Sequence, residues 1–106
     1  MHRAEVWWTN LPEPVGRRPV VLVSRDDVHA VRALVTVAPV TTRVRGIPTE
    51  VALGKHEGLP RPCVANLDAL TTIPKRTLER YAGTLSPAKC AALDEAIGFA
   101  LGLEVV

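Results

Sequence analysis

The stretch GRRPVVLVS, residues 16–24, places two arginines directly before a proline and a run of β-branched residues. Apolar side chains at every position from 20 to 23 would cover both faces of an extended chain, which predicts a central strand over residues 19–24. Pro19 is tolerated as the first residue of a strand, fixes its own φ and disfavours helix at Arg18. Arg18 is therefore predicted to lie extended at the entrance of this strand.

A second apolar run, ALVTVAPV at residues 33–40, predicts another strand, and Thr41 follows directly where it ends. If the two strands pair antiparallel, the start of the first lies beside the end of the second. Arg18 and Thr41 would then meet at one edge of the sheet. Further guanidinium groups stand nearby in the sequence, at Arg17, Arg43 and Arg45. A guanidinium and a hydroxyl converging in basic surroundings suit a phosphate group.

The rest of the chain predicts short strands, loops and one clear helix. Strands are expected over 5–9, 49–53, 63–67, 69–73 and 81–85. A helical turn is expected from Asp26 or Asp27 through Val31, and one or two turns over 74–81. Ser86 as N-cap and Pro87 at the first helical position open the helix. Its apolar stripe comprises Cys90, Leu93, Ile97, Ala100 and Leu101, and Gly102 is expected to end it. This pattern predicts a single domain over 1–106, mainly β, with a strongly bent antiparallel sheet or half-barrel.

Length, charge and cysteine spacing indicate a single domain that is neither secreted nor membrane-spanning. The 106 residues suffice for one domain, and a net charge of +2 does not by itself identify a nucleic-acid-binding protein. The basic excess lies in residues 1–49, where seven arginines face four acids. The start resembles no signal peptide, and no apolar stretch approaches the roughly 18–20 residues that span a bilayer. Cys63 and Cys90 lack metal-site spacing, so we expect a cytoplasmic protein with reduced thiols and no metal.

The blocks EVWWTNLPEPVG, RRPVVLVS, VAPVTT, LPRPCVANLDALTTIPKRTL and GTLSPAKCAALDEAIGFALGL occur in this order along nearly the whole chain. In this the sequence resembles the MazF/PemK toxins, the endoribonucleases (mRNA interferases) of bacterial type II toxin–antitoxin systems. The resemblance implies an SH3-like barrel shared with the CcdB toxins, a homodimer, and cleavage of single-stranded RNA at short sequences without a metal or other cofactor. It also implies a cognate antitoxin, MazE-like, acidic and partly disordered.

The resemblance places the family's catalytic arginine on Arg18 and its catalytic threonine on Thr41. It implies attack of a ribose 2′-hydroxyl on the adjacent phosphorus, leaving a 2′,3′-cyclic phosphate and a 5′-hydroxyl. A fixed guanidinium and a hydroxyl donor suit this reaction because negative charge develops on the phosphoryl oxygens. The general base stays open. Many relatives carry a longer loop before the RP motif, often with an acidic residue suited to acid–base catalysis or substrate gating. Here Gly16 is followed at once by Arg17, and Glu13, the nearest acid, is the candidate to replace that residue in contact with RNA.

Other residues are candidates for contact with RNA or with a partner. Arg17, Arg43 and Arg45 are expected to bind the RNA backbone. Asn66 and Asp68 are two residues apart and are expected on the same face of a strand next to the site. There they would read base edges by hydrogen bonds, the alternative being that they only form a turn. Trp7 and Trp8 are adjacent on a strand, so we expect only one of them to face the core. The other is expected to contact the antitoxin or a second subunit, the alternative being a partly covered aromatic residue on the surface.

Two other functions remain open from the sequence. The first is a CcdB-like inhibitor of DNA gyrase, which would act through the end of the last helix, but the tail GLEVV has no aromatic anchor. The second is a homologue that binds RNA without cutting it.

Overall fold

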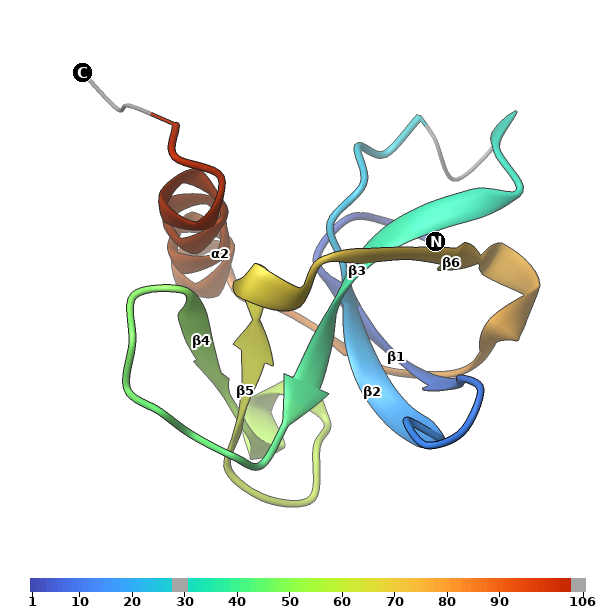
Figure 1. Ribbon diagram of the computed structural model, residues 1–106, viewed down its shortest axis with the longest axis horizontal. Coiled ribbons are helices and arrows are strands. Elements are labelled where there is room, and N and C mark those ends of the chain that lie inside the picture. Colours follow the sequence, from blue (N-terminus) through green and yellow to red (C-terminus); the bar gives the residue numbers. More distant parts are fainter. Residues whose placement is uncertain (28–30, 104–106) are drawn as a thin grey trace.

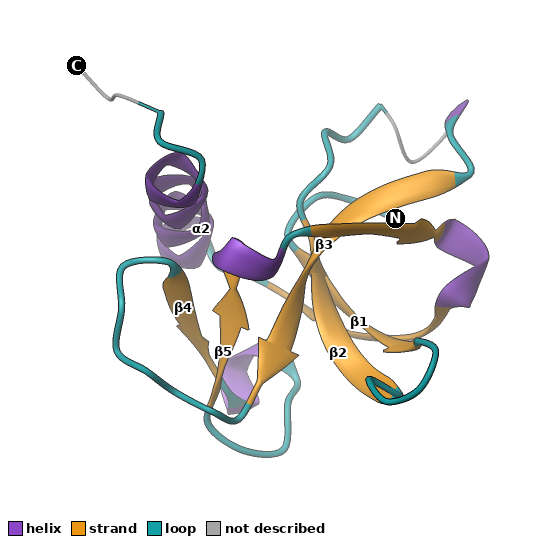
Figure 2. Cartoon of the chain, viewed as in Figure 1, coloured by secondary structure: helices purple, strands orange, loops and turns teal. Residues whose placement is uncertain are grey.

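The computed structural model describes residues 1–27 and 31–103 of the chain. The predicted turn from Asp26 or Asp27 through Val31 lies largely outside these residues. Within them, seven strands, three 3-10 turns and one long helix follow one another (Figures 1 and 2). In chain order they are β1 (Glu5–Asn10), β2 (Arg17–Leu22), β3 (Leu34–Thr41), β4 (Glu50–Leu53), η1 (Lys55–Glu57), β5 (Cys63–Asn66), η2 (Leu67–Ala69), β6 (Thr71–Pro74), η3 (Lys75–Thr77), β7 (Leu78–Thr84) and α2 (Pro87–Ala100).

The strands form one bent antiparallel sheet in the order β4-β5-β3-β2-β1-β7, and β6 also pairs with β3. The eight-residue strand β3 joins the two halves of this sheet. Its residues 37–39 pair with β2, its first half pairs with β6, and its last two residues pair with β5. The helix α2 stands beside β4 and η2 (Figure 1). The predicted class, mainly β with a C-terminal helix, is confirmed.

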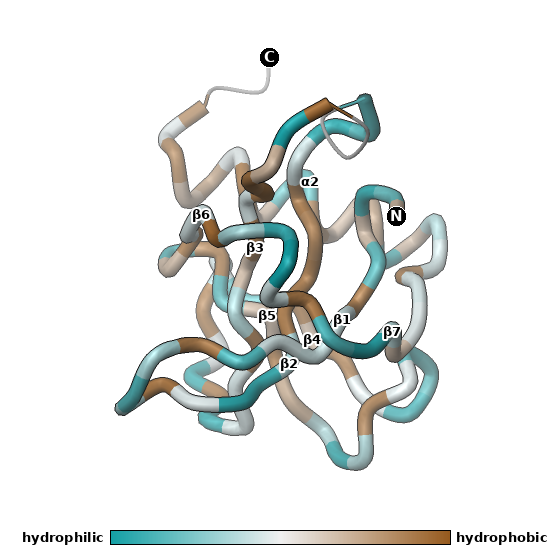
Figure 3. The backbone as a smooth tube through the Cα atoms, turned by 90° about the vertical axis from the view of Figure 1, so that its right-hand side faces the viewer, coloured by the Kyte–Doolittle hydropathy of each residue, from teal (hydrophilic) through white to brown (hydrophobic). Residues whose placement is uncertain are grey.

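Alternation along β2 and β3 sends apolar side chains to two separate clusters. Val21 and Ala38 belong to a cluster that also contains Leu93 of α2. Val20 and Val37 belong to a second cluster on the other side of the strands. Both strands are thus buried on both faces, as the apolar run at residues 20–23 predicted. Brown, apolar segments accordingly run through the middle of the molecule in Figure 3.

The helix α2 begins and ends where the sequence predicts. The hydroxyl of Ser86 accepts a hydrogen bond from the N–H of Lys89 at 3.2 Å, and Gly102 takes a φ of +70°. Leu101, predicted on the apolar stripe, is instead 58% exposed. It follows the last helical residue, where the chain turns away from the core. No helix in residues 1–27 or 31–103 has both the length and the apolar character required for a membrane span.

Residues 78–80 were predicted to be helical and are part of β7 instead. This strand pairs with β1, so that Thr9 lies opposite Leu78 and Trp8 opposite Arg80. The buried hydroxyl of Thr9 also donates a hydrogen bond to the carbonyl of Thr77 at 2.8 Å. Pairing with a strand distant in sequence has overridden the local preference of this segment, and only the 3-10 turn η3 remains of the predicted helix.

Candidate active site

The register of β2 and β3 places Arg18 and Thr41 together. Val20 pairs with Pro39 and Val21 with Ala38, and continuing this register brings Arg18 opposite Thr41. The start of β2 and the end of β3 lie at the same end of the molecule, beside the β1–β2 and β3–β4 loops (Figure 1). Both residues line one pocket of about 170 Å³, here called the polar pocket. Its lining residues are Arg18, Pro39, Thr41, Arg43, Arg45, Glu50, Asn66 and Ala69.

Arg18 carries a donor with no acceptor. Its side chain lies at the pocket wall, and its Nε is buried without a hydrogen-bond partner among the described residues. A buried donor left unpaired costs about 1–3 kcal/mol of stability, so such groups are uncommon and often functional. An anionic oxygen in the polar pocket would be a suitable acceptor for this guanidinium.

Thr41 is oriented by the backbone that follows it. Its Oγ1 accepts a hydrogen bond from the N–H of Arg43 at 3.1 Å. Because the oxygen is the acceptor here, the hydroxyl keeps its own hydrogen for another partner. Thr41 is also the last residue of β3, and there it pairs with Val64 of β5. Its backbone position is therefore fixed by a strand rather than by a loop.

The β3–β4 loop, residues 42–49, brings Arg43 and Arg45 to the polar pocket, and Glu50 holds this loop in place. The Glu50 carboxylate accepts hydrogen bonds from the N–H of Arg45, at 3.0 and 3.2 Å, and from the N–H of Gly46, at 2.9 Å. Gly46 takes a φ of +72°, which favours glycine. Sequence reasoning missed Glu50, since an acid at the start of a strand gives no signal that it holds the loop before it.

Asn66 and Asp68 do not share a strand face, so that prediction is wrong. Asn66 ends β5 and lines the polar pocket, and its Oδ1 accepts from the N–H of Asp68 at 3.0 Å. This bond caps η2, which turns Asp68 away from the strand. The Asp68 carboxylate instead accepts the hydroxyl of Thr49 at 2.6 Å. The alternative, that the two residues form a turn, agrees with this cap. Base reading by Asn66 and Asp68 stays a prediction.

Arg17 and Glu13 lie outside the lining of the polar pocket. The Arg17 guanidinium lies 4.9 Å from the ring centroid of Trp8, and its Nε donates to the Glu79 carboxylate at 3.4 Å. Glu13 is exposed in the β1–β2 loop. Contact of these two side chains with RNA stays a prediction.

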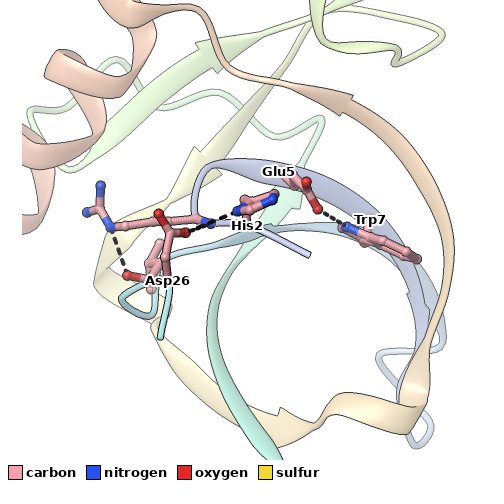
Figure 4. Close-up of polar contacts among 6 residues, drawn as sticks. His2, Glu5, Trp7 and Asp26 are labelled. Atoms are coloured by element: carbon pink, nitrogen blue, oxygen red, sulfur yellow. Dashed lines mark hydrogen bonds and ion pairs between the residues drawn. The ribbon is translucent and has the colours of Figure 1, made fainter. Parts of the chain in front are cut away.

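Both tryptophans pack against apolar clusters, so the expectation that only one faces a core is wrong. Trp8 packs on the cluster that contains Leu93, and Trp7 packs on the second cluster. The Trp7 indole N–H donates to the Glu5 carboxylate at 2.9 Å (Figure 4), and its ring meets Tyr81 edge to face. The reason is that β1 has an apolar cluster on each of its faces. Contact with a partner stays a prediction for both residues.

A second pocket, of about 250 Å³, shares Thr41 with the first and is here called the apolar pocket. Its lining residues are Trp8, Pro19, Val40, Thr41, Thr42, Leu59, Pro60, Arg61 and Cys63. Burial raises the pKa of the Cys63 thiol, and the nearby charge of Glu57 raises it further. Cys63 is therefore a poor nucleophile near neutral pH. Within residues 1–27 and 31–103, His, Cys, Asp and Glu side chains form no cluster of three that could hold a metal ion.

Comparison with known proteins assigns the chain to a family. Residues 2–101 match the family described as the PemK-like, MazF-like toxin of type II toxin–antitoxin systems. Endoribonuclease MazF3 of Mycobacterium tuberculosis is 44% identical over 89 residues, covering 84% of this chain and 86% of that protein. Probable endoribonuclease MazF5 of the same species is 37% identical over 100 residues, covering 90% and 91%.

Solved structures agree with the sequence relatives. The Mycobacterium tuberculosis toxin MazF-mt6 superimposes with a TM-score of 0.88 at 39% identity, covering 95% of this chain and 99% of that one. An endoribonuclease in complex with its cognate antitoxin from a mycobacterial species gives 0.89 at 32% identity, covering 100% and 99%. The chain therefore belongs to the PemK-like, MazF-like toxins of type II toxin–antitoxin systems.

Proposed function

We propose that the chain is an endoribonuclease that cuts single-stranded RNA without a metal ion, with Arg18 and Thr41 as its catalytic residues. The observation that carries the proposal is the polar pocket, in which a guanidinium with an unpaired buried Nε and an oriented hydroxyl converge. The family and the endoribonuclease relatives support the reaction class. The polar pocket is small, basic and open to solvent, which suits one phosphodiester group rather than a folded partner.

In the proposed reaction, the 2′-hydroxyl oxygen of one nucleotide attacks its own 3′-phosphorus. A bond forms between O2′ and phosphorus, and the bond from phosphorus to the 5′-oxygen of the next nucleotide breaks. The 2′-hydroxyl gives up one proton and the leaving 5′-oxygen takes up one, so the reaction consumes no net proton. The products are a 2′,3′-cyclic phosphate and a 5′-hydroxyl.

The two residues act on the phosphoryl oxygens. The Arg18 guanidinium binds the oxygen on which charge develops, and its fixed positive charge needs no proton transfer to do so. The Thr41 hydroxyl donates to the same phosphoryl group, because its oxygen is already occupied as an acceptor by the N–H of Arg43. Arg43 and Arg45 bind neighbouring phosphates from the β3–β4 loop.

The proposal includes a homodimer that acts in the cytoplasm and an acidic antitoxin that neutralises it. The mycobacterial endoribonuclease solved with its cognate antitoxin supports the second partner. An acidic peptide would be attracted by the same arginines that bind RNA phosphates.

The test is cleavage of total RNA in the presence of EDTA, followed by mapping of the new 5′-hydroxyl ends. The wild-type protein should cut at a recurring short sequence, and Arg18→Ala and Thr41→Val should lose at least about 100-fold in rate. Arg76→Ala, at an exposed residue on η3, serves as the matched control. Undiminished cleavage by both site variants would remove the assignment. RNA binding without cleavage by the wild type would instead indicate a non-cutting homologue.

A further inference from the structure

We infer that the apolar pocket is a nucleobase subsite, which receives the base of a nucleotide next to the scissile phosphate. The inference rests on the proposed function and adds a determinant of where RNA is cut. Thr41 lines both the polar pocket and the apolar pocket, so the two share a wall. A group bound in the apolar pocket therefore lies directly beside a phosphate bound in the polar pocket.

The two pockets open on opposite sides of the same strand ends. Along β2, Arg18 reaches the polar pocket and its neighbour Pro19 lines the apolar pocket. Along β3, Pro39 lines the polar pocket and its neighbour Val40 lines the apolar pocket. Consecutive residues of a strand point to opposite faces, which explains the division. A nucleotide chain crossing this end of the sheet would present its phosphate on one side and a base on the other.

The walls of the apolar pocket suit a flat, weakly polar ring. Three of its lining residues carry rings, namely Trp8, Pro19 and Pro60, and Leu59 and Val40 complete the apolar surface. Hydroxyl groups occur only at Thr41 and Thr42. Single-stranded RNA is recognised through splayed bases that stack on side chains of this kind. A pocket with few polar groups selects by size and shape more than by hydrogen bonding.

Positive charge surrounds this apolar surface. Arg61 lines the apolar pocket, and the guanidinium groups of Arg17 and Arg80 lie 4.9 and 5.9 Å from the ring centroid of Trp8. These arginines would meet the phosphates on either side of the inserted base. Arg17 also pairs with the Glu79 carboxylate, so Arg61 and Arg80 contribute most of this positive charge. Cations around an apolar pocket complement an alternating chain of bases and phosphates, which favours RNA over an apolar side chain of a protein partner as the occupant.

The first experiment uses an RNA oligonucleotide that contains the mapped cut site. Abasic nucleotides replace each base near the cut, one at a time. One replacement should lower kcat/KM by roughly 5- to 150-fold, the range expected for one stacked base. Thr42→Trp, an exposed lining residue changed to fill the pocket, should lower cleavage of the intact RNA by a similar factor but add little to the abasic substrate. Ala91→Trp on the exposed face of α2 is the control for an added indole.

The second experiment measures binding and does not depend on cleavage. In a Trp7→Phe variant, Trp8 is the sole tryptophan. A single-stranded oligonucleotide with 2′-deoxy nucleotides throughout, which has no 2′-hydroxyl to attack phosphorus, should change its fluorescence. Replacing one base at a time by an abasic nucleotide should make this change much smaller at one position. Absence of cleavage by the wild type would remove the proposed function, whereas this binding signal tests the pocket alone.

The inference is overturned if every abasic substrate is cut and bound like the intact RNA. It is also overturned if Thr42→Trp remains folded, by its melting temperature, and cuts normally. Should Thr42→Trp escape neutralisation by the antitoxin while RNA cleavage is unchanged, the apolar pocket belongs to the protein partner instead.

Discussion

Replacing Arg18 by methionine should make the protein more stable and at the same time inactive. Methionine keeps the length and apolar character of the arginine stem but has no donor at the position of Nε, which is buried without a partner. An unpaired buried donor costs about 1–3 kcal/mol, and we take the lower end because the rest of the side chain is only partly buried. Arg18→Met should therefore gain about 1 kcal/mol in the free energy of unfolding.

The gain is measurable as a shift in melting temperature. The entropy of unfolding scales with chain length, so about 1 kcal/mol raises the Tm of a domain of this size by about 4–5 °C. Thermal unfolding of wild type and Arg18→Met supplies this value, and RNA cleavage by the same samples should fall by at least about 100-fold. Arg76→Met removes an exposed guanidinium and should leave both quantities unchanged.

A fall of several degrees in the Tm of Arg18→Met would refute the reasoning, because it would mean that Arg18 contributes to the fold rather than weakening it. Cleavage within tenfold of the wild type would refute the catalytic part separately. The melting temperature thus tests the cost of the unpaired Arg18 Nε, and RNA cleavage tests the catalytic role of the guanidinium.

Three further predictions follow from single contacts. Glu50→Ala frees the β3–β4 loop and should lower the rate of RNA cleavage roughly tenfold, because the exposed hydrogen bonds that it removes are worth about 1–1.5 kcal/mol. Unchanged cleavage at the same Tm would show that Glu50 is not needed to hold this loop. Gly58→Ala should cost more than about 2 kcal/mol of stability by thermal unfolding, because φ is +81° and an added Cβ would lie 1.9 Å from the Ala82 carbonyl oxygen. The raised pKa of Cys63 means that the folded state resists forming the thiolate, so stability is retained below the unfolded thiol's pKa, near 9, and falls as the pH rises above it. Cys63→Ala should flatten that decline in unfolding measurements between pH 7 and 10, and an identical decline in the variant would contradict the assignment.

The pairing that builds the polar pocket was predictable from sequence because β2 and β3 are apolar on both faces. Such runs are buried centrally, and their antiparallel pairing then fixes which ends meet. The two apolar runs alone were therefore enough to predict that Arg18 and Thr41 lie close together. The helix α2 was predictable for a similar reason, because Ser86, Pro87 and Gly102 are local signals that act within one turn.

The errors concern residues whose structure depends on distant partners. Asp68 leaves the strand because the Asn66 side chain caps η2, as in the turn that the sequence offered as an alternative, and because Thr49 donates to its carboxylate. Only the Thr49 contact, between residues distant in the chain, has no sequence signal. Residues 78–80 become a strand because β1 supplies the pairing. The apolar pocket escaped prediction for the same reason, since segments far apart in the chain line it. Glu50 escaped because its bonds to Arg45 and Gly46, although local, depend on how the β3–β4 loop turns.

The dual pairing of β3 ties activity to the integrity of the whole fold. Arg18 sits on the half of the sheet built by β1 and β2, whereas Thr41 is held by β5 in the other half. A local opening that separates these two halves would move the Arg18 guanidinium away from the Thr41 hydroxyl before the whole domain unfolds. The rate of amide hydrogen exchange at the β3–β5 pairing should thus report the fraction of molecules that can cut RNA. Mutations remote from both pockets that weaken this pairing should lower the cleavage rate.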